Sequence, residues 1–191
     1  MFRSSLHSDA RGFSLVELMM VVAVLGTIAA MAMLVSPSAI NQARSDSGLA
    51  QAVEIVRSAR DLAVSSRRNI QLRFLGTNGI QTVRMEIPGP ATTIVRTLEL
   101  EGRMRIGLAP GVPDTPDLFG NASATAFGPT PFRMFTSEGT LVDANGDVLN
   151  GTLFLADSAD PRSARAITIF GATGAIRTWQ WDGARWQEAS W

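Results

Sequence analysis

The sequence predicts an α+β protein in which a long N-terminal helix packs on a C-terminal antiparallel β-sheet domain. Three observations carry this prediction. An apolar run extends from Phe13 to Val35 with Glu17 as its only charge, and an amphipathic helical pattern continues to about Asn69. Beyond Asn69, short segments of alternating apolar and polar residues are separated by turns rich in Gly and Pro, which is typical of half-buried strands.

The amino-acid composition limits the classes of function that this chain can have. The 191 residues suit one modest domain plus an N-terminal segment, and 46% of them are hydrophobic, as in a chain with a packed core. The 17 basic and 17 acidic residues balance, so there is no general attraction to nucleic acid or anionic lipid. Cysteine is absent and His7 is the only histidine, which removes most nucleophiles, general bases and metal ligands. We therefore expect no enzyme activity, no cofactor and no metal site.

The run from Phe13 to Val35 is long enough to cross a bilayer core of roughly 30 Å as a helix. Arg3 and Arg11 precede it, which favours a cytoplasmic N-terminus. A secretory signal peptide is one alternative, but its apolar core is usually only about 7–15 residues long. A plain anchor is another, yet an isolated anchor gains nothing from Glu17, whose insertion costs about 2.5 kcal/mol or more.

The start of this run resembles the N-terminus of the type IV pilin and type II secretion pseudopilin superfamily. The resemblance rests on a short polar leader, the stretch RGFSLVE at residues 11–17 and the apolar residues behind it. In that family a membrane peptidase cuts after the glycine and methylates the new N-terminal phenylalanine. The resemblance thus implies cleavage between Gly12 and Phe13 and methylation of Phe13. It also implies that Glu17 pairs with the free amine of a neighbouring subunit during filament assembly; snorkelling of Glu17 to the headgroups is the alternative.

The next segment has the pattern of an amphipathic stalk. Apolar residues recur at spacings of three and four along one helix face: Leu49, Val53, Val56, Ala59 and Ala63. Ser45 and Asp46 fall among the other, polar positions. We expect one helix from Phe13 to about Arg68, kinked or interrupted at Pro37 where it leaves the membrane.

The rest of the chain is expected to form the β domain. Strands are predicted at 70–74, 83–87, 94–100, 104–108, 132–135, 152–155, 166–170 and 175–181. Residues 109–131, rich in Gly, Pro, Ser, Thr and Asp, are expected to form a long surface loop. Trp179 and Trp181 share one strand face, which favours core or cross-strand packing over a ligand platform. The domains are then a leader at 1–12, a transmembrane helix at 13–35, a stalk helix at 36–69 and a periplasmic β domain at 70–191.

Three stretches of the β domain resemble the GspH/FimT group of minor pilins and pseudopilins: FTSEGT at 135–140, AITI at 166–169 and GAIR at 174–177. This resemblance implies a minor pseudopilin of the type II secretion pseudopilus, supporting export of folded proteins across the outer membrane. It implies a single-pass protein of the bacterial inner membrane whose partners are other pseudopilins, the prepilin peptidase and the inner-membrane assembly platform. The alternative is a FimT-like minor pilin of a type IV pilus, acting in assembly priming or DNA uptake.

DNA contact would involve Arg177 and Arg185, which lie among the C-terminal tryptophans. Position 175 is alanine where a second basic residue would strengthen such a patch, and Asp182 and Glu188 offset the two arginines. The sequence therefore does not favour nucleic acid as a partner. A third alternative is a membrane-anchored periplasmic enzyme that uses carboxylates.

The stretch DANGD at 143–147 looks like the start of a calcium loop. The EF-hand pattern requires glycine at its sixth position and glutamate at its twelfth. Val148 and Phe154 occupy those positions, so we expect a simple turn at Asn145-Gly146.

Overall fold

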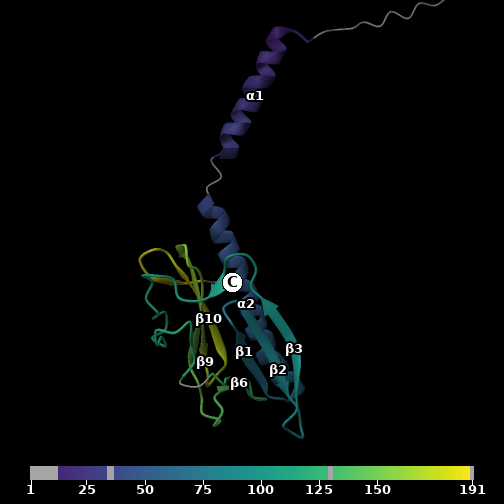
Figure 1. Ribbon diagram of the computed structural model, residues 1–191, viewed down its shortest axis with the longest axis vertical. Coiled ribbons are helices and arrows are strands. Elements are labelled where there is room, and N and C mark those ends of the chain that lie inside the picture. Colours follow the sequence, from purple (N-terminus) through teal and green to yellow (C-terminus); the bar gives the residue numbers. More distant parts are fainter. Residues whose placement is uncertain (1–12, 34–36, 129–130, 190–191) are drawn as a thin grey trace, which may run out of the picture. The chain divides into compact units, whose positions relative to one another are not determined.

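The computed structural model describes residues 13–33, 37–128 and 131–189 (Figure 1). The chain divides into two compact units, one up to Ala39 and one from Ile40 onward. In the first unit, helix α1 spans Leu15–Met33. No helix in the described ranges has the length and hydropathy that crossing a membrane requires. The last two residues of the expected transmembrane segment, 34 and 35, lie outside those ranges.

Where one helix was expected from Phe13 to about Arg68, the structure has α1 and a second helix, α2 (Pro37–Ser66). Residues 34–36, on which continuity depends, lie outside the described part of the chain. Pro37 is the first residue of α2, a position that proline tolerates because the first N–H groups of a helix have no partner within it. At the other end, Arg67 adopts a positive φ of 51° and the helix stops.

Two antiparallel sheets follow α2 (Figure 1). The five-stranded sheet has the order β3-β2-β1-β6-β7, with bounds Thr92–Glu99, Gly79–Met85, Ile70–Leu75, Met134–Phe135 and Leu141–Val142. The six-stranded sheet has the order β11-β10-β9-β8-β4, with bounds Trp186–Glu188, Ala175–Trp181, Asp160–Phe170, Gly151–Asp157 and Arg105–Ile106. Its sixth strand, β5 (Thr125–Ala126), also pairs with β8. The predicted α+β class, with a helix packed on antiparallel sheets, is confirmed.

One apolar face of α2 packs against both sheets and forms the main core. All five apolar positions predicted for that face are buried. They share a cluster with Ile70, Leu72 and Ile80 of the first sheet and with Leu153 and Ile167 of the second. Burial of each Leu, Ile or Val side chain in this cluster stabilises the fold by roughly 1.5–3 kcal/mol. The helix therefore joins two sheets that would otherwise present apolar faces to water.

Ser45 departs from the expected pattern, because it is buried and not on the polar face of the helix. It lies four residues before Leu49, so the two side chains fall on the same face. Its hydroxyl donates a hydrogen bond to the carbonyl oxygen of Asn41 at 2.9 Å, which satisfies the buried polar group. Hydrophobicity alone misplaced this residue.

Each predicted strand overlaps one in the structure, but two long strands differ in their bounds: β2 begins at Gly79 and not at residue 83, and β9 begins at Asp160 and not at residue 166. Three strands were not predicted, and each has only two or three residues: β5, β7 and β11. The expected loop at 109–131 contains β5, so it is not entirely irregular. A strand of two or three residues is too short to show an alternation of apolar and polar residues. Such strands form because neighbouring strands pair with them. Trp179 and Trp181 pack against buried residues on one face of β10, as predicted.

Candidate functional site

Apart from Glu17, the surface of α1 is apolar on every side over the residues whose side chains the structure describes. From Phe13 to Ile28, every large hydrophobic side chain is more than half exposed, and Phe13 itself is 82% exposed. A helix that is apolar all round is normally buried, either in a protein core or in a membrane. A contiguous apolar surface of this kind marks a site of protein or membrane contact.

The start of α1 shows how Glu17 is held. The Ser14 hydroxyl accepts a hydrogen bond from the backbone N–H of Glu17 at 3.2 Å. The Ser14 carbonyl accepts bonds from the N–H groups of Glu17 and Leu18, both at 3.1 Å. Ser14 is therefore the N-cap, and Glu17 is the third helical residue, as in the capping pattern S-x-x-E.

This geometry adds a local role for Glu17 to the role that the family resemblance implied. A carboxylate in the first helical turn interacts favourably with the positive end of the helix dipole. Ser14 was missed in the sequence analysis, although the spacing of Ser14 and Glu17 was a readable signal. Phe13 directly precedes the cap, and Gly12 lies outside the described residues.

In the second unit, Arg60 of α2 connects two turns. Its Nε donates to the carbonyl oxygen of Gly139 at 3.3 Å, and its Nη2 donates to that of Thr173 at 3.2 Å. A Cβ on Gly174 would lie 2.2 Å from the Gly139 oxygen, so the turns touch only because that residue is glycine. These turns belong to two of the three stretches that resemble the GspH/FimT group. The structure thus gives these residues a packing role where helix and sheets meet.

Arg177 and Arg185, named as possible DNA contacts, both lie beside carboxylates. Arg177 on β10 is 3.5 Å from Asp117 and 3.8 Å from Glu188. Arg185 lies in the turn before β11, where its Nε is 3.7 Å from Asp182. Hydrogen bonds from the backbone N–H groups of Arg185 and Ala184 hold the pKa of Asp182 below its ordinary value, so this partner stays charged. Carboxylates of the same chain therefore offset the positive charge of both arginines.

Side-chain contacts attach the loop at 109–131 to the second sheet. Asp117 accepts hydrogen bonds from Thr168 of β9 and from Arg177 of β10. The indole N–H of Trp186 donates to the carbonyl oxygen of Pro113 at 2.6 Å. Because the Trp186 indole contacts the loop, less of its surface is available for stacking on nucleic-acid bases.

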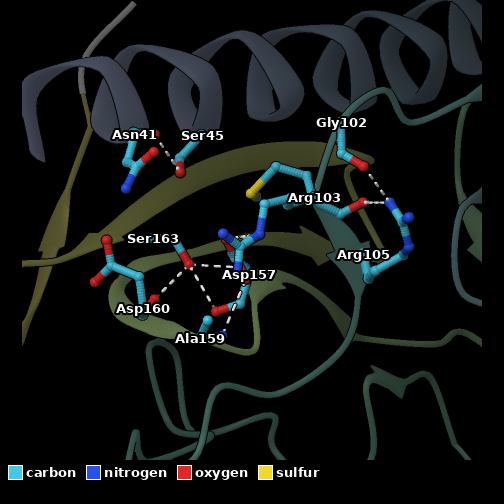
Figure 2. A network of polar contacts seen from close by, with 10 residues as sticks. Asn41, Ser45, Gly102, Arg103, Arg105, Asp157, Ala159, Asp160 and Ser163 are labelled. Atoms are coloured by element: carbon cyan, nitrogen blue, oxygen red, sulfur yellow. Dashed lines mark hydrogen bonds and ion pairs between the residues drawn. The ribbon is translucent and has the colours of Figure 1, made fainter. Parts of the chain in front are cut away.

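A polar network lies beside the first half of α2 (Figure 2). The Ser163 hydroxyl accepts from the N–H of Asp157 at 2.7 Å and lies 2.5 Å from the carbonyl oxygen of Asp160, closing the turn between β8 and β9. Arg103 pairs with the Asp157 carboxylate at 3.0 Å (Figure 2). The adjoining cavity of about 360 Å³ is lined by two arginines, Arg44 and Arg103, and two acids, Glu101 and Asp157. Its charges balance, so it favours no charged ligand.

The predicted turn at Asn145-Gly146 is confirmed. The Asp143 carboxylate accepts from the N–H groups of Asn145 at 2.8 Å and of Asp147 at 3.0 Å, and Gly146 has φ of 89°. This carboxylate closes its own turn. Within the ranges that the structure covers, no three acidic or histidine side chains are grouped as a metal site would need.

Comparison with known proteins bears on the N-terminus. Residues 7–33 match the family model described as the prokaryotic N-terminal methylation motif. This confirms the prepilin-type motif on the residues that carried the resemblance, and the N-terminus is that of a type IV pilin-like protein. Such a motif indicates a membrane-anchored protein that assembles with other pilins.

Two solved structures are similar to this chain, both of the type IV minor pilin FimU from Pseudomonas aeruginosa strain PAO1. Each has 16% sequence identity to it, with TM-scores of 0.46 and 0.42. The alignments cover 76% and 78% of this chain and 91% and 92% of those chains. No curated protein sequence matches this chain significantly. Similarity at this level establishes neither a shared function nor shared partners.

Proposed function

We propose that this protein is a minor pseudopilin, a structural subunit of the type II secretion pseudopilus that supports export of folded proteins across the outer membrane. The observation that carries the proposal is helix α1, which is apolar and exposed from Phe13 to Ile28 and carries one carboxylate, that of Glu17, in its first turn, all within the matched methylation motif. A helix of this kind is suited to lipid before assembly and to bundling with similar helices afterwards.

The proposed maturation explains why the charge is tolerated. The prepilin peptidase hydrolyses the bond between Gly12 and Phe13 and transfers a methyl group from a sulfonium methyl donor to the new amine of Phe13, with release of the donor as a thioether and loss of one amine proton. The amine stays cationic, and Glu17 of one subunit pairs with the amine of the next as the α1 helices stack. An unpaired carboxylate in an apolar bundle is strongly unfavourable, so the helices are most stable in the alignment that brings Glu17 next to an amine. Glu17 would therefore set the register of the helices.

The β domain fits a role in contact and shape. The protein would be a single-pass inner-membrane protein with a cytoplasmic N-terminus, and the unit beginning at Ile40 would lie in the periplasm. There it would contact other pseudopilins, while the inner-membrane assembly platform adds subunits. The carboxylates beside Arg177 and Arg185 weigh against DNA uptake, which is why a secretion machine is preferred to a type IV pilus.

A gene deletion in the native host tests the proposal, with secreted proteins, surface pili and DNA uptake scored in the same strain. We expect loss of secreted proteins with normal pili. Intact secretion with lost pili or lost uptake would move the protein to the type IV pilus, as a minor pilin resembling FimT.

Complementation of that strain with point variants isolates Glu17. Glu17→Gln keeps a residue type that suits the third position of a capping box but removes the charge. We expect this variant to be inserted and cleaved normally yet to fail in secretion. Glu54→Gln, which removes an exposed carboxylate on α2, is the matched control and should complement fully. Full complementation by Glu17→Gln would contradict the pairing role and leave only the capping role.

A further inference from the structure

Arg133 is a buried arginine at the edge of a cavity. It directly precedes β6, and its carbonyl oxygen accepts from the N–H of Leu72 at 3.0 Å, which extends the pairing of β1 with β6. Only 5% of the residue is exposed. Its guanidinium carbon lies 4.5 Å from the ring centroid of Phe74 and 5.2 Å from that of Phe127. Two aromatic rings thus hold the cation, and one of them, Phe74, also lines the cavity.

The guanidinium is not fully paired. Nη2 donates to the carbonyl oxygen of Pro131 at 2.8 Å. Nε and Nη1 are buried, and neither has a hydrogen-bond partner among the residues that the structure describes. Burial lowers the pKa of Arg133 to about 10, so it remains a cation at neutral pH. Buried polar and charged groups in proteins are normally paired, and exceptions call for a reason.

The cavity beside Arg133 has a volume of about 600 Å³ and an unbalanced charge. Its charged lining residues are Arg73 and Arg133, and no carboxylate lines it. Arg73 donates to the side-chain oxygen of Gln71 at 2.8 Å, a neutral partner. Within the described ranges, neither arginine takes part in an ion pair. This differs from the balanced cavity beside α2, because the charged side chains that line the Arg133 cavity are all positive.

The side chains that line the Arg133 cavity indicate which class of anion it would bind. Apolar side chains make up much of the lining, among them Phe74, Leu75, Ile106 and Phe132. We propose that this cavity binds an organic carboxylate, whose charged end contacts Arg133 and Arg73 and whose apolar body packs against Phe74 and Ile106. Guanidinium groups suit carboxylates because their planar donors match the two oxygens. To reach the ligand, the Arg133 guanidinium exchanges its single bond to Pro131 for stronger charge-assisted bonds.

This site is separate from α1 and goes beyond the proposed function without depending on it. The carboxylate has two possible sources: a small free acid, or an acidic side chain on another protein segment. The two share the same chemistry at Arg133 and Arg73. Butyrate stands for the first source and the blocked dipeptide acetyl-Leu-Glu-amide for the second.

The test is a titration of the full-length chain, purified in an uncharged detergent, with butyrate, the dipeptide, butyramide and inorganic phosphate. Binding is followed by calorimetry and by the NMR signals of the arginine Nε–H groups. We expect saturable binding of butyrate or of the dipeptide, with a shift of the Arg133 signal. Tighter binding of one identifies the source. Butyramide, which has the same body without the charge, should not bind, and phosphate should bind more weakly.

Three variants locate the site. Arg133→Met keeps an apolar chain against the two rings and removes the charge, and Arg73→Gln removes a half-buried charge that the core does not need. Each should weaken carboxylate binding at least about tenfold, as expected for one charge-assisted hydrogen bond. Arg96→Gln, at an exposed ion pair with Glu54, is the control and should bind as the wild type does. If Arg133→Met does not fold, Arg73→Gln alone decides. No saturable carboxylate binding, equal binding of phosphate, or unchanged affinity in Arg73→Gln would overturn the proposal.

Discussion

Gly171 lies where the two sheets of the β domain meet, and its replacement by alanine tests how they are joined. Its N–H donates to the side-chain oxygen of Asn150 at 2.9 Å, and its carbonyl accepts from the N–H of Leu141 on β7 at 2.8 Å. A Cβ at this position would lie 2.0 Å from the carbonyl oxygen of Leu149 and 2.9 Å from that of Leu141. Both obstacles are backbone atoms, so a side chain cannot simply rotate away.

The size of the effect follows from these contacts. Overpacking a well-packed site usually costs about 1–3 kcal/mol, and each backbone hydrogen bond lost adds about 1 kcal/mol. We therefore expect Gly171→Ala to destabilise the protein by about 3 kcal/mol. For a chain of this size, that corresponds to a fall in Tm of roughly 6–12 °C.

Thermal unfolding of the full-length protein in detergent, followed by tryptophan fluorescence, measures this fall. Three of the four tryptophans, Trp179, Trp181 and Trp186, lie on β10 and β11, so their fluorescence reports on the second sheet. Gly107→Ala is the matched control, because a Cβ there meets no atom within 4 Å and the backbone is not left-handed. The reasoning is refuted if the two variants unfold at the same temperature.

Three further predictions concern α2 and the last turn. Ile55→Ala, at a fully buried position, should cost about 2–5 kcal/mol in urea unfolding; a loss below 1 kcal/mol would mean that α2 is not part of the core. Asp46→Ala leaves the buried Arg165 guanidinium without the carboxylate 2.9 Å away. Because Asp46 is partly exposed, we expect the free energy of unfolding in urea to fall by about 1–3 kcal/mol. An unchanged midpoint would show that solvent replaces this partner. The folded-state pKa of Asp182 is lowered by hydrogen bonds from Arg185 and Ala184, so its contribution is present above the unfolded pKa and is lost as pH falls through the folded value. The protection factor of the Arg185 amide, which is corrected for the intrinsic pH dependence of exchange, should therefore fall in acid, and Asp182→Asn should abolish that fall; equal profiles of the protection factor in both proteins would exclude the carboxylate as the cause.

Local patterns were enough to predict the regular parts of the fold. The buried face of α2 from Leu49 to Ala63 was predictable because apolar residues recur at helical spacing over many residues. The strand beginning at Ile70 was predictable because apolar and polar residues alternate along it. Ser45 was misplaced because a serine does not signal burial, although its spacing from Leu49 does. The two-residue strand β7 contains no repeat, so it could not be predicted and is ordered by its neighbours.

The N-terminal site was predictable for a similar reason. Its features lie next to one another in the chain: a cleavage motif, an apolar run and one carboxylate, and the match over residues 7–33 confirms the motif. The capping of Glu17 by Ser14 was equally local and could have been read from their spacing. The roles of Gly12, Phe13 and Glu17 in cleavage, methylation and assembly remain predictions.

The sequence by itself determined the class of protein, the apolar N-terminal helix and the order of long elements, because each depends on residues close together in the chain. Only the tertiary structure decided the state of the arginines, which the sequence presents as evenly scattered. The charge of Arg177 is offset by Asp117 from a distant loop, whereas Arg133 is buried between two phenylalanines beside a cavity without acids. The physical reason is that the charge available for binding depends on what folding places within a few ångströms, and no local pattern encodes that distance.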